Sequence, residues 1–350
     1  MNQLKIPLLK KICELPGAPG FEHRIRNFLI EQLNDVADKI EIDNMGNLLA
    51  IKLAKQDDAK NVMVTAHMDE IGFIVNHIDD NGFVRFHPLG GFDPKTLTAQ
   101  RVIVHGEQDL IGVMGSKPVH VMHAEEKNKM PKISDFFIDL GMDKESVEKI
   151  VRIGDPVTRE RELVEMGQCV NCKSIDNRIS VYILLETFLQ LKEVPCNIYA
   201  VFTVQEEVGL RGAMVAAHHI NPDFGINLDT TIAYDVPGSQ PQEQVTKLGH
   251  GTAIKIMDSS VICDRRMVEY LKILANDNDI PWQPEILPAG GTDTATLQRN
   301  GKSGSISGAI SIPTRHLHQV IEMAHQDDIY NSIRLLTMAV QNLDKHDWSW

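Results

Sequence analysis

Apolar positions near the N-terminus recur at helical spacing in two stretches, residues 4–12 and 25–33. The intervening run Pro16-Gly17-Ala18-Pro19-Gly20 breaks the pattern, because Pro and Gly interrupt helices. We therefore expect two short helices before the first strand of the chain.

β-rich runs come next. Residues 40–43 and 48–53 flank a turn-forming segment, which predicts a hairpin. Residues 61–66 form a third run, which stops at His67. These three runs predict the beginning of a sheet.

The pattern changes between about Ile71 and Val157, where short β segments dominate and one helical stretch is expected near residues 146–151. After Gly167 helices and strands alternate again. The elements expected there are a long amphipathic helix at 177–191, strands at 198–204 and 224–228, and helices at 213–218, 264–276 and 328–343, the last two capped by Asp264 and Asp328. The chain therefore reads as an α/β domain with an inserted β-rich module.

Composition narrows the class of protein. A chain of 350 residues favours about two domains, and 43% hydrophobic with 24% charged residues is ordinary for a globular protein without a membrane span. The net charge of −13 gives no basic footprint for nucleic acid. Five cysteines suit reduced thiols, and no secretory signal precedes the first helix, so we expect a cytoplasmic protein.

Polar residues stand where strand patterns stop. His67, the pair Glu206 and Glu207, Asp229 and His318 each follow an apolar or β-rich run. In α/β sheets, reactive groups gather outside the carboxyl ends of the strands, so these residues are expected to meet in one crevice. Imidazole and carboxylate ligands without thiolates suit Zn²⁺, Co²⁺ or Mn²⁺ in a catalytic site.

Two more carboxylates fit this picture. Asp176, at the start of a predicted helix, could bridge two cations, and Asp69 could accept the second ring N–H of His67. If the backbone at Glu206 and Glu207 is extended, the two side chains point to opposite faces, so one could ligate while the other acts as a base. The residues themselves do not decide which does which. Each residue alone also fits a commonplace role, such as a helix cap or a solvated charge.

Several motifs resemble those of the tetrahedral-type di-metal aminopeptidases, the glutamyl and deblocking aminopeptidase family. The resemblance runs in order from Pro16 to Asp328, and it rests on His67–Gly72, Ser174–Arg178, Val204–Gly212, Pro313–His318, Asp235–Gly238, Val261–Asp264 and Gly290–Asp293. It implies two divalent metal ions per subunit, Zn²⁺ or else Co²⁺ or Mn²⁺. It also implies that Asp176 bridges the two ions.

The resemblance implies further roles at matching positions. His67 and Asp229 would hold one ion, and Glu207 and His318 the other. Glu206 would be the general base for a metal-activated water, and Asp69 would orient His67. His316, two residues before His318, is not implied as a ligand. Gly290 and Gly291 are expected to form a turn beside the crevice, with Asp293 behind the ligands.

The resemblance also implies the architecture. Residues 1–69 and 163–350 would form a mixed-sheet α/β metallopeptidase catalytic domain, and residues 70–162 a small inserted β-rich dimerisation domain. In this family such dimers assemble into a dodecameric shell, which would admit short peptides only. Three departures, Gln319, Ser174 and the stretch 294–305, leave the presumed ligands intact and bear on substrate preference.

We therefore expect a metallo-aminopeptidase that releases N-terminal residues from short peptides. One alternative is an amide hydrolase, or deacylase, acting on N-acyl amino acids. A second is a non-catalytic shell-forming protein. Glycan hydrolysis needs only two carboxylates, but the His ligands argue against it. Gly301-Lys302-Ser303 lacks the first Gly of a phosphate-binding loop, so we expect no nucleotide site.

Overall fold

The fold is described for residues 4–350 of a computed structural model, so the first three residues of the predicted catalytic part lie outside it. Its largest element is a mixed sheet of eleven strands among these residues. In spatial order the main path is β1 (Lys39–Ile42), β2 (Leu48–Lys52), β12 (Asn197–Thr203), β3 (Asn61–His67), β13 (Phe224–Ile232), β16 (Ile306–Arg315), β17 (Glu322–His325), β11 (Cys169–Cys172) and β10 (Val164–Met166). Strands β14 (Thr252–Met257) and β15 (Trp282–Ile286) branch from β16.

Four neighbouring strands at the centre of the sheet are parallel. β3 pairs in parallel with β12 and with β13, and β13 pairs in parallel with β16. These strands are almost fully buried, as expected for a parallel sheet covered on both faces. Their carboxyl ends therefore meet at one edge of the sheet, where the candidate residues were expected.

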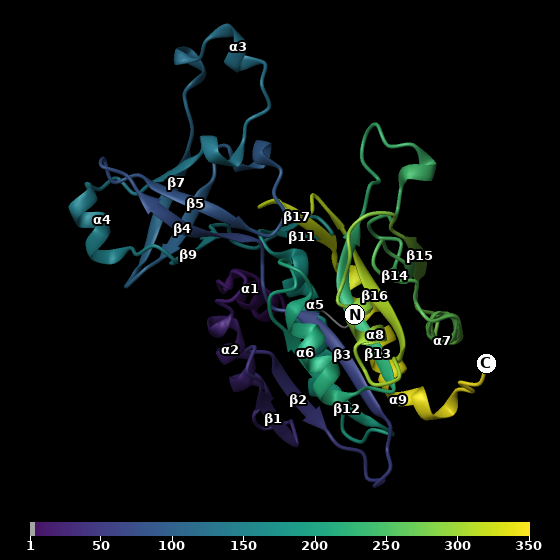
Figure 1. The fold of residues 1–350 in the computed structure, drawn as a ribbon. Helices are drawn as coiled ribbons and strands as arrows, with labels where there is room; N and C mark the ends of the chain where they lie inside the picture. The colour runs from purple at the N-terminus through teal and green to yellow at the C-terminus, as the bar shows by residue number, and fades with distance from the viewer. Residues whose placement is uncertain (1–3) are drawn as a thin grey trace.

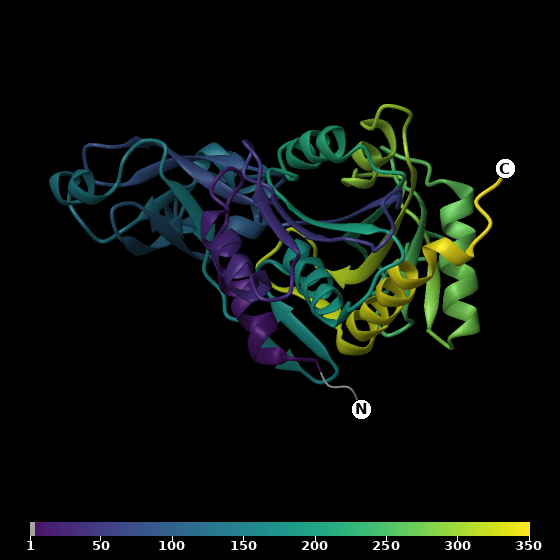
Figure 2. The same cartoon turned by 90° about the horizontal axis from the view of Figure 1, so that it is seen from below.

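Helices cover both faces of the sheet (Figure 2). One layer contains α1 (Ile6–Glu14), α2 (His23–Leu33), α5 (Ile175–Gln190), α7 (Arg265–Asp277) and α9 (Gln326–Asn342), and its side chains form the larger hydrophobic core. The other layer contains α6 (Arg211–Ile220) and α8 (Thr294–Arg299), which pack on a smaller core. The result is a three-layer arrangement of helices, sheet and helices.

Two expectations about helices were wrong. The predicted amphipathic helix is α5, but it is buried on all sides over residues 175–188 because it lies between the sheet and the helices α1 and α9. Asp328 does not cap α9, whose N-cap is His325. The Asp328 carboxylate instead accepts the N–H groups of Gly249 and Gly251 at 2.7 and 2.8 Å. The predicted cap of α7 by Asp264 is confirmed.

A separate closed barrel lies beside the sheet (Figure 1). Its strands, in order around the barrel, are β4 (Gly72–Ile78), β5 (Val84–Leu89), β8 (Phe137–Asp139), β7 (Asp109–Gly115), β6 (Arg101–His105) and β9 (Pro156–Arg159). The barrel has its own hydrophobic core, which confirms a mixed-sheet α/β fold accompanied by a compact β module. Helix α4 (Lys144–Ile150) fits the expected helical stretch, and the short α3 (Ala124–Lys127) was not expected.

Short 3-10 turns complete the description. They are η1 (Pro94–Leu97), η2 (Val119–Val121), η3 (Ile133–Asp135), η4 (Pro241–Glu243) and η5 (Leu343–Lys345). A bidentate ion pair joins the barrel to the helical layer: Arg24 of α2 donates to both carboxylate oxygens of Asp109 of β7, at 2.6 and 2.7 Å. Across residues 4–350, helices that combine the length and the apolar character of a membrane span are absent.

Candidate metal centre

The predicted residues come together at the carboxyl edge of the parallel strands. His67 is the last residue of β3, and Asp176 lies in the first turn of α5. Glu206 and Glu207 follow β12, and His318 follows β16. The strand pattern had suggested that Asp229 follows its strand, but β13 extends to Ile232 and carries Asp229 inside it.

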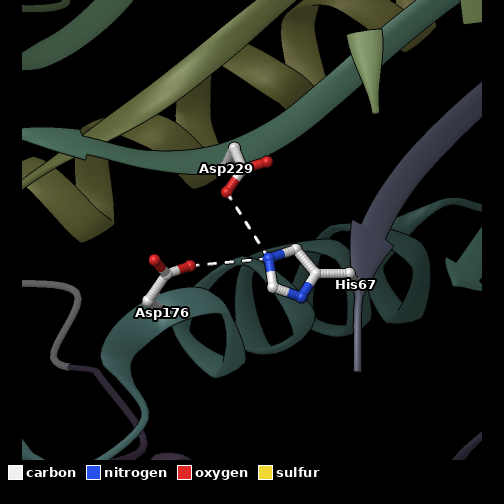
Figure 3. A group of neighbouring side chains, drawn as sticks. All are labelled: His67, Asp176 and Asp229. Atoms are coloured by element: carbon white, nitrogen blue, oxygen red, sulfur yellow. Dashed lines mark ion pairs between the residues drawn. The ribbon is translucent and has the colours of Figure 1, made fainter. Parts of the chain in front are cut away.

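Three buried side chains form the first group, defined as His67, Asp176 and Asp229 (Figure 3). Nε2 of His67 lies 3.4 Å from Oδ1 of Asp176 and 3.7 Å from Oδ1 of Asp229. The sheet itself sets two of these positions, because His67 and Asp229 stand on adjacent parallel strands. Three potential ligand atoms thus converge on one point.

The second group consists of Asp176, Glu207 and His318. Nε2 of His318 lies 3.5 Å from Oδ2 of Asp176 and 3.6 Å from Oε2 of Glu207. Asp176 therefore turns one oxygen toward each group. The His318 side chain is 40% exposed, whereas that of His67 is 2% exposed, so solvent reaches the centre from the side of the second group.

The separations suit cations better than hydrogen bonds. Tetrahedral ligands bonded to Zn²⁺ at about 2.0 to 2.1 Å lie roughly 3.3 to 3.5 Å from one another. The distances of 3.4 to 3.7 Å within the two groups are close to this range. Oδ1 of Asp176 is buried without a hydrogen-bond partner in residues 4–350. The donor set and spacing therefore fit two divalent cations that share Asp176.

The crowding of buried carboxylates also indicates that cations would stabilise the site. Burial raises the pKa of Glu207 to about 7 and raises those of Glu206 and Asp229. Burial opposes protonation of His318, yet the carboxylates of Glu207 and Asp176 raise its pKa to about 10. Several carboxylates so close together repel one another, and positive charge between them would stabilise the ionised forms.

Asp69 makes contacts that differ from the expectation. Nδ1 of His67 lies closest to the main-chain oxygen of Asp69, at 3.1 Å, with its carboxylate Oδ1 at 3.4 Å. The two carboxylate oxygens accept the main-chain N–H groups of Glu206 and Glu207, each at 3.0 Å. Asp69 therefore fixes the His67 ring through its backbone and the acidic pair through its side chain.

The acidic pair lies in a tight turn, so the premise of an extended backbone was wrong. The N–H groups of Gly209 and Leu210 both bond to the main-chain oxygen of Glu206, at 2.9 Å. Oε2 of Glu206 is 3.9 Å from Nε2 of His67, and Glu206 belongs to neither group of potential ligands. The turn thus places Glu207 in the second group and leaves Glu206 outside both groups. An extended backbone had been expected to separate the two side chains in the same way.

Glu322, which sequence reasoning missed, supports the shared ligand. It begins β17, is fully buried, and accepts the main-chain N–H of Asp176 at 2.9 Å. An acid between the apolar neighbours Ile321 and Met323 was the one available signal. Asp293 is also buried, and it accepts a hydrogen bond of 2.7 Å from Thr203 at the end of β12.

Two buried hydrogen-bond networks, one around Arg178 and one around Lys173, were also missed. Arg178 is fully buried and donates to the main-chain oxygens of Met68, Ile12 and Leu15 at 2.6 to 2.8 Å. Lys173 donates to the carboxylate of Glu70 at 2.5 and 2.6 Å. Both networks anchor the segment that follows His67, and nothing in the local sequence indicates their partners.

Other sequence candidates lie outside the two groups. Among the described residues, His316 is not part of a cluster able to hold a cation. Gly290 has a φ of +82° and its main-chain oxygen accepts the N–H of Ser259, so the expected turn is present. All five cysteines are free thiols.

Comparisons with known proteins point to one family. The profile of the M42 glutamyl aminopeptidases matches residues 46–335. A putative aminopeptidase of Acetivibrio thermocellus is 41% identical over 95% of this chain and 97% of its own. The lysyl aminopeptidase of Pyrococcus furiosus is 36% identical over 98% of each chain. The solved TET1 peptidase of Pyrococcus horikoshii, which can assemble into a tetrahedron or a large octahedral shell, is 31% identical and superposes with a TM-score of 0.87 over 96% of this chain and 98% of that one.

Proposed function

Because the chain belongs to the M42 glutamyl aminopeptidase family, we propose that it is a di-metal aminopeptidase that releases N-terminal residues from short peptides. The family and the aminopeptidase names of the relatives make it a peptidase, and they confirm the resemblance found in the sequence. The family name specifies glutamyl residues and the name of one relative specifies lysyl residues. The proposal therefore concerns N-terminal residues in general. The observation that carries it is the sharing of Asp176 between two groups of potential ligands.

The residues divide between holding cations and moving protons. His67 and Asp229 would hold one cation, Glu207 and His318 the other, and Asp176 both. Bound there, two divalent cations would polarise a peptide carbonyl and lower the pKa of a water. The first group is buried and the second is open to solvent, so substrate would approach past His318.

Glu206 would take a proton from the attacking water and return one to the departing amine. Its carboxylate lies outside both groups, yet its Oε2 is only 3.9 Å from Nε2 of His67. The two hydrogen bonds of Asp69 hold its turn in place. A buried carboxylate with a raised pKa is suited to exchange protons near neutral pH.

The proposed base is tested by replacing Glu206 with Gln. We expect Glu206→Gln to keep both cations and to lower kcat for an aminoacyl-anilide by about 100- to 10,000-fold. Glu243→Gln, at an exposed position, serves as the matched control. Elemental analysis of the purified variants reports the cations. Full activity in Glu206→Gln with both cations bound would contradict the proposed base.

The products of a tetrapeptide identify the substrate class. An aminopeptidase releases free N-terminal residues from an unblocked tetrapeptide and leaves the N-acetylated peptide intact. A deacylase gives the reverse result. A non-catalytic shell protein would cleave neither peptide under any metal condition.

We further propose that the barrel joins subunits within a closed shell. The TET1 peptidase of known structure assembles into such shells. Apolar side chains on and near the barrel are unusually exposed, at 53 to 63%: Ile111, Val113, Val119, Val121 and Met130. Exposed apolar surface of this kind favours an interface between subunits.

Light scattering after size exclusion tests the barrel as the contact. We expect the double variant Val119→Asp and Val121→Asp to break the assembly into smaller species. Ile42→Asp, on an apolar residue of β1 that is 51% exposed, is the control. An unchanged assembly in the double variant would contradict a role for this surface.

A further inference from the structure

Two glycines next to the barrel lie beside the second group, and one of them contacts it. Gly90 and Gly91 lie between β5 and η1, outside the main sheet. The main-chain oxygen of Gly91 is 2.9 Å from Nδ1 of His318. A Cβ on Gly90 would lie 3.4 Å from Oε2 of Glu207. The barrel therefore contacts His318 through Gly91 and leaves little room between Gly90 and Glu207.

The contact with Gly91 determines how His318 can act. A carbonyl oxygen only accepts, so the bond places the ring proton on Nδ1 and leaves Nε2 free to ligate. Nε2 is the atom that faces Asp176 and Glu207. Across residues 4–350 this is the one hydrogen bond found for the His318 ring. The backbone of His318 is itself in the left-handed region, at φ +60°, so its position depends on surrounding contacts.

The glycine segment is anchored in the barrel. The next residue, Phe92, stacks on Phe73 of the barrel core with 4.4 Å between ring centroids. The Arg159 guanidinium lies over the Phe92 ring at 5.9 Å. Phe92 also lines a small cavity together with Gln319 and Val320, which follow His318. A displacement of this anchor would therefore reach His318.

Within residues 4–350, the side chains of the first group receive no hydrogen bond from the barrel. Nδ1 of His67 bonds to the main-chain oxygen of Asp69, two residues along the same chain segment. We propose that the segment Gly90–Phe92 is a positioning element of the second group, so that the barrel sets the affinity for the cation which that group holds. This inference rests on the proposed di-metal function. It gives the inserted module a part in the metal centre in addition to contacts between subunits.

Gly90→Ala tests the proposal in the full-length protein. Gly90 has a φ of +99°, and an added Cβ would lie 2.4 Å from Cγ2 of Ile71, so the segment must shift. Gly141→Ala is the matched control, since Gly141 is a barrel glycine with φ +66° and open space around its Cβ position. Protein freed of metal by a chelator is titrated with Co²⁺ in a calorimeter.

We expect Gly90→Ala to bind one of the two Co²⁺ ions, the one held by the second group, about 10- to 100-fold more weakly than the wild type, which is the usual effect of losing a contact behind a ligand. The other Co²⁺ should bind within about twofold of the wild-type affinity, and Gly141→Ala should change neither affinity. If Gly90→Ala does not fold, Phe92→Leu removes the aromatic anchor and should show the same selective loss.

Two results would overturn the positioning role: wild-type affinity for both equivalents in the variant, or an equal loss of both. Light scattering of each variant separates these results from a loss of assembly. Failure of the proposed function is distinguishable, because in that case the wild-type chain would not bind two equivalents at all. If the wild type and the variant both bind two Co²⁺ ions with equal affinity, the positioning role is wrong but the proposed di-metal function stands.

Discussion

The two groups that share Asp176 are built in opposite ways. The first takes His67 and Asp229 from adjacent parallel strands and is buried. The second takes Glu207 and His318 from loops, and the barrel supports it from outside the sheet. The candidate centre thus combines a buried half, positioned by sheet register, with a more open half positioned by loops. The open half is the side that solvent reaches.

Replacing Asp176 should have the largest effect, because both groups depend on this residue. We expect Asp176→Asn to lose both cations, because each carboxylate oxygen faces a different group. Since a cation contributes several kcal/mol to catalysis, kcat/KM should fall by at least about 10,000-fold. Elemental analysis and anilide hydrolysis measure the two effects. Retention of one full equivalent would show that the groups do not depend on a shared ligand.

The buried support of the first group should appear in stability. Arg178→Met would leave the main-chain oxygens of Met68, Ile12 and Leu15 without their donor. We expect the free energy of unfolding to drop by about 3 to 5 kcal/mol, measured by urea denaturation at fixed protein concentration. Arg265→Met, at an exposed position of α7, is the control. A loss no greater than that of the control would remove Arg178 from the support.

Asp69 connects the two halves, since it contacts His67 and the turn of Glu206 and Glu207. In Asp69→Asn only one oxygen remains to accept two N–H groups. We expect kcat/KM to fall by about 10- to 100-fold with both cations retained. Asp57→Asn, at an exposed position, is the control. Unchanged kinetics in Asp69→Asn would show that the turn holds without this carboxylate.

A separate effect, seen only in the pH dependence of stability, should arise far from the cations. Burial raises the pKa of Asp328 to about 7, although two glycine N–H groups favour the ionised form. The folded protein therefore binds this proton more tightly than the unfolded chain does, so the ionised carboxylate lowers stability above pH 7. This penalty is relieved as the pH falls from about 7 to 4, by up to about 4 kcal/mol, because each pKa unit corresponds to about 1.4 kcal/mol. Urea denaturation of Asp328→Asn should show that part of the pH dependence absent; an identical pH dependence in both proteins would contradict the assignment.

Local pattern predicted part of the half of the centre that the sheet holds. His67 ends a clear β-rich run as expected, whereas Asp229 lies inside β13 and not after it. The supports were not predictable, because Glu322 reaches Asp176 across 146 residues and the Gly91 oxygen reaches His318 across 227. The burial of α5 on all sides depends likewise on α1 and α9, which no window of its own sequence contains.

The ligand roles themselves came from resemblance and not from pattern. Glu206 and Glu207 are equivalent in composition, and the turn that distinguishes them was expected to be extended. Glycine positions such as Gly90 carry no chemical signal in a single sequence. The role proposed for Gly90 becomes apparent only from its position beside the second group in the folded chain.

The number of divalent cations bound by the wild-type chain tests the central claim most directly. Protein stripped by a chelator should not hydrolyse aminoacyl-anilides, and titration with Zn²⁺, Co²⁺ or Mn²⁺ should show two equivalents per chain while restoring hydrolysis. The account predicts that activity returns only as the second equivalent binds. Hydrolysis that persists in the stripped protein, or saturation at a single equivalent with full activity, would contradict it.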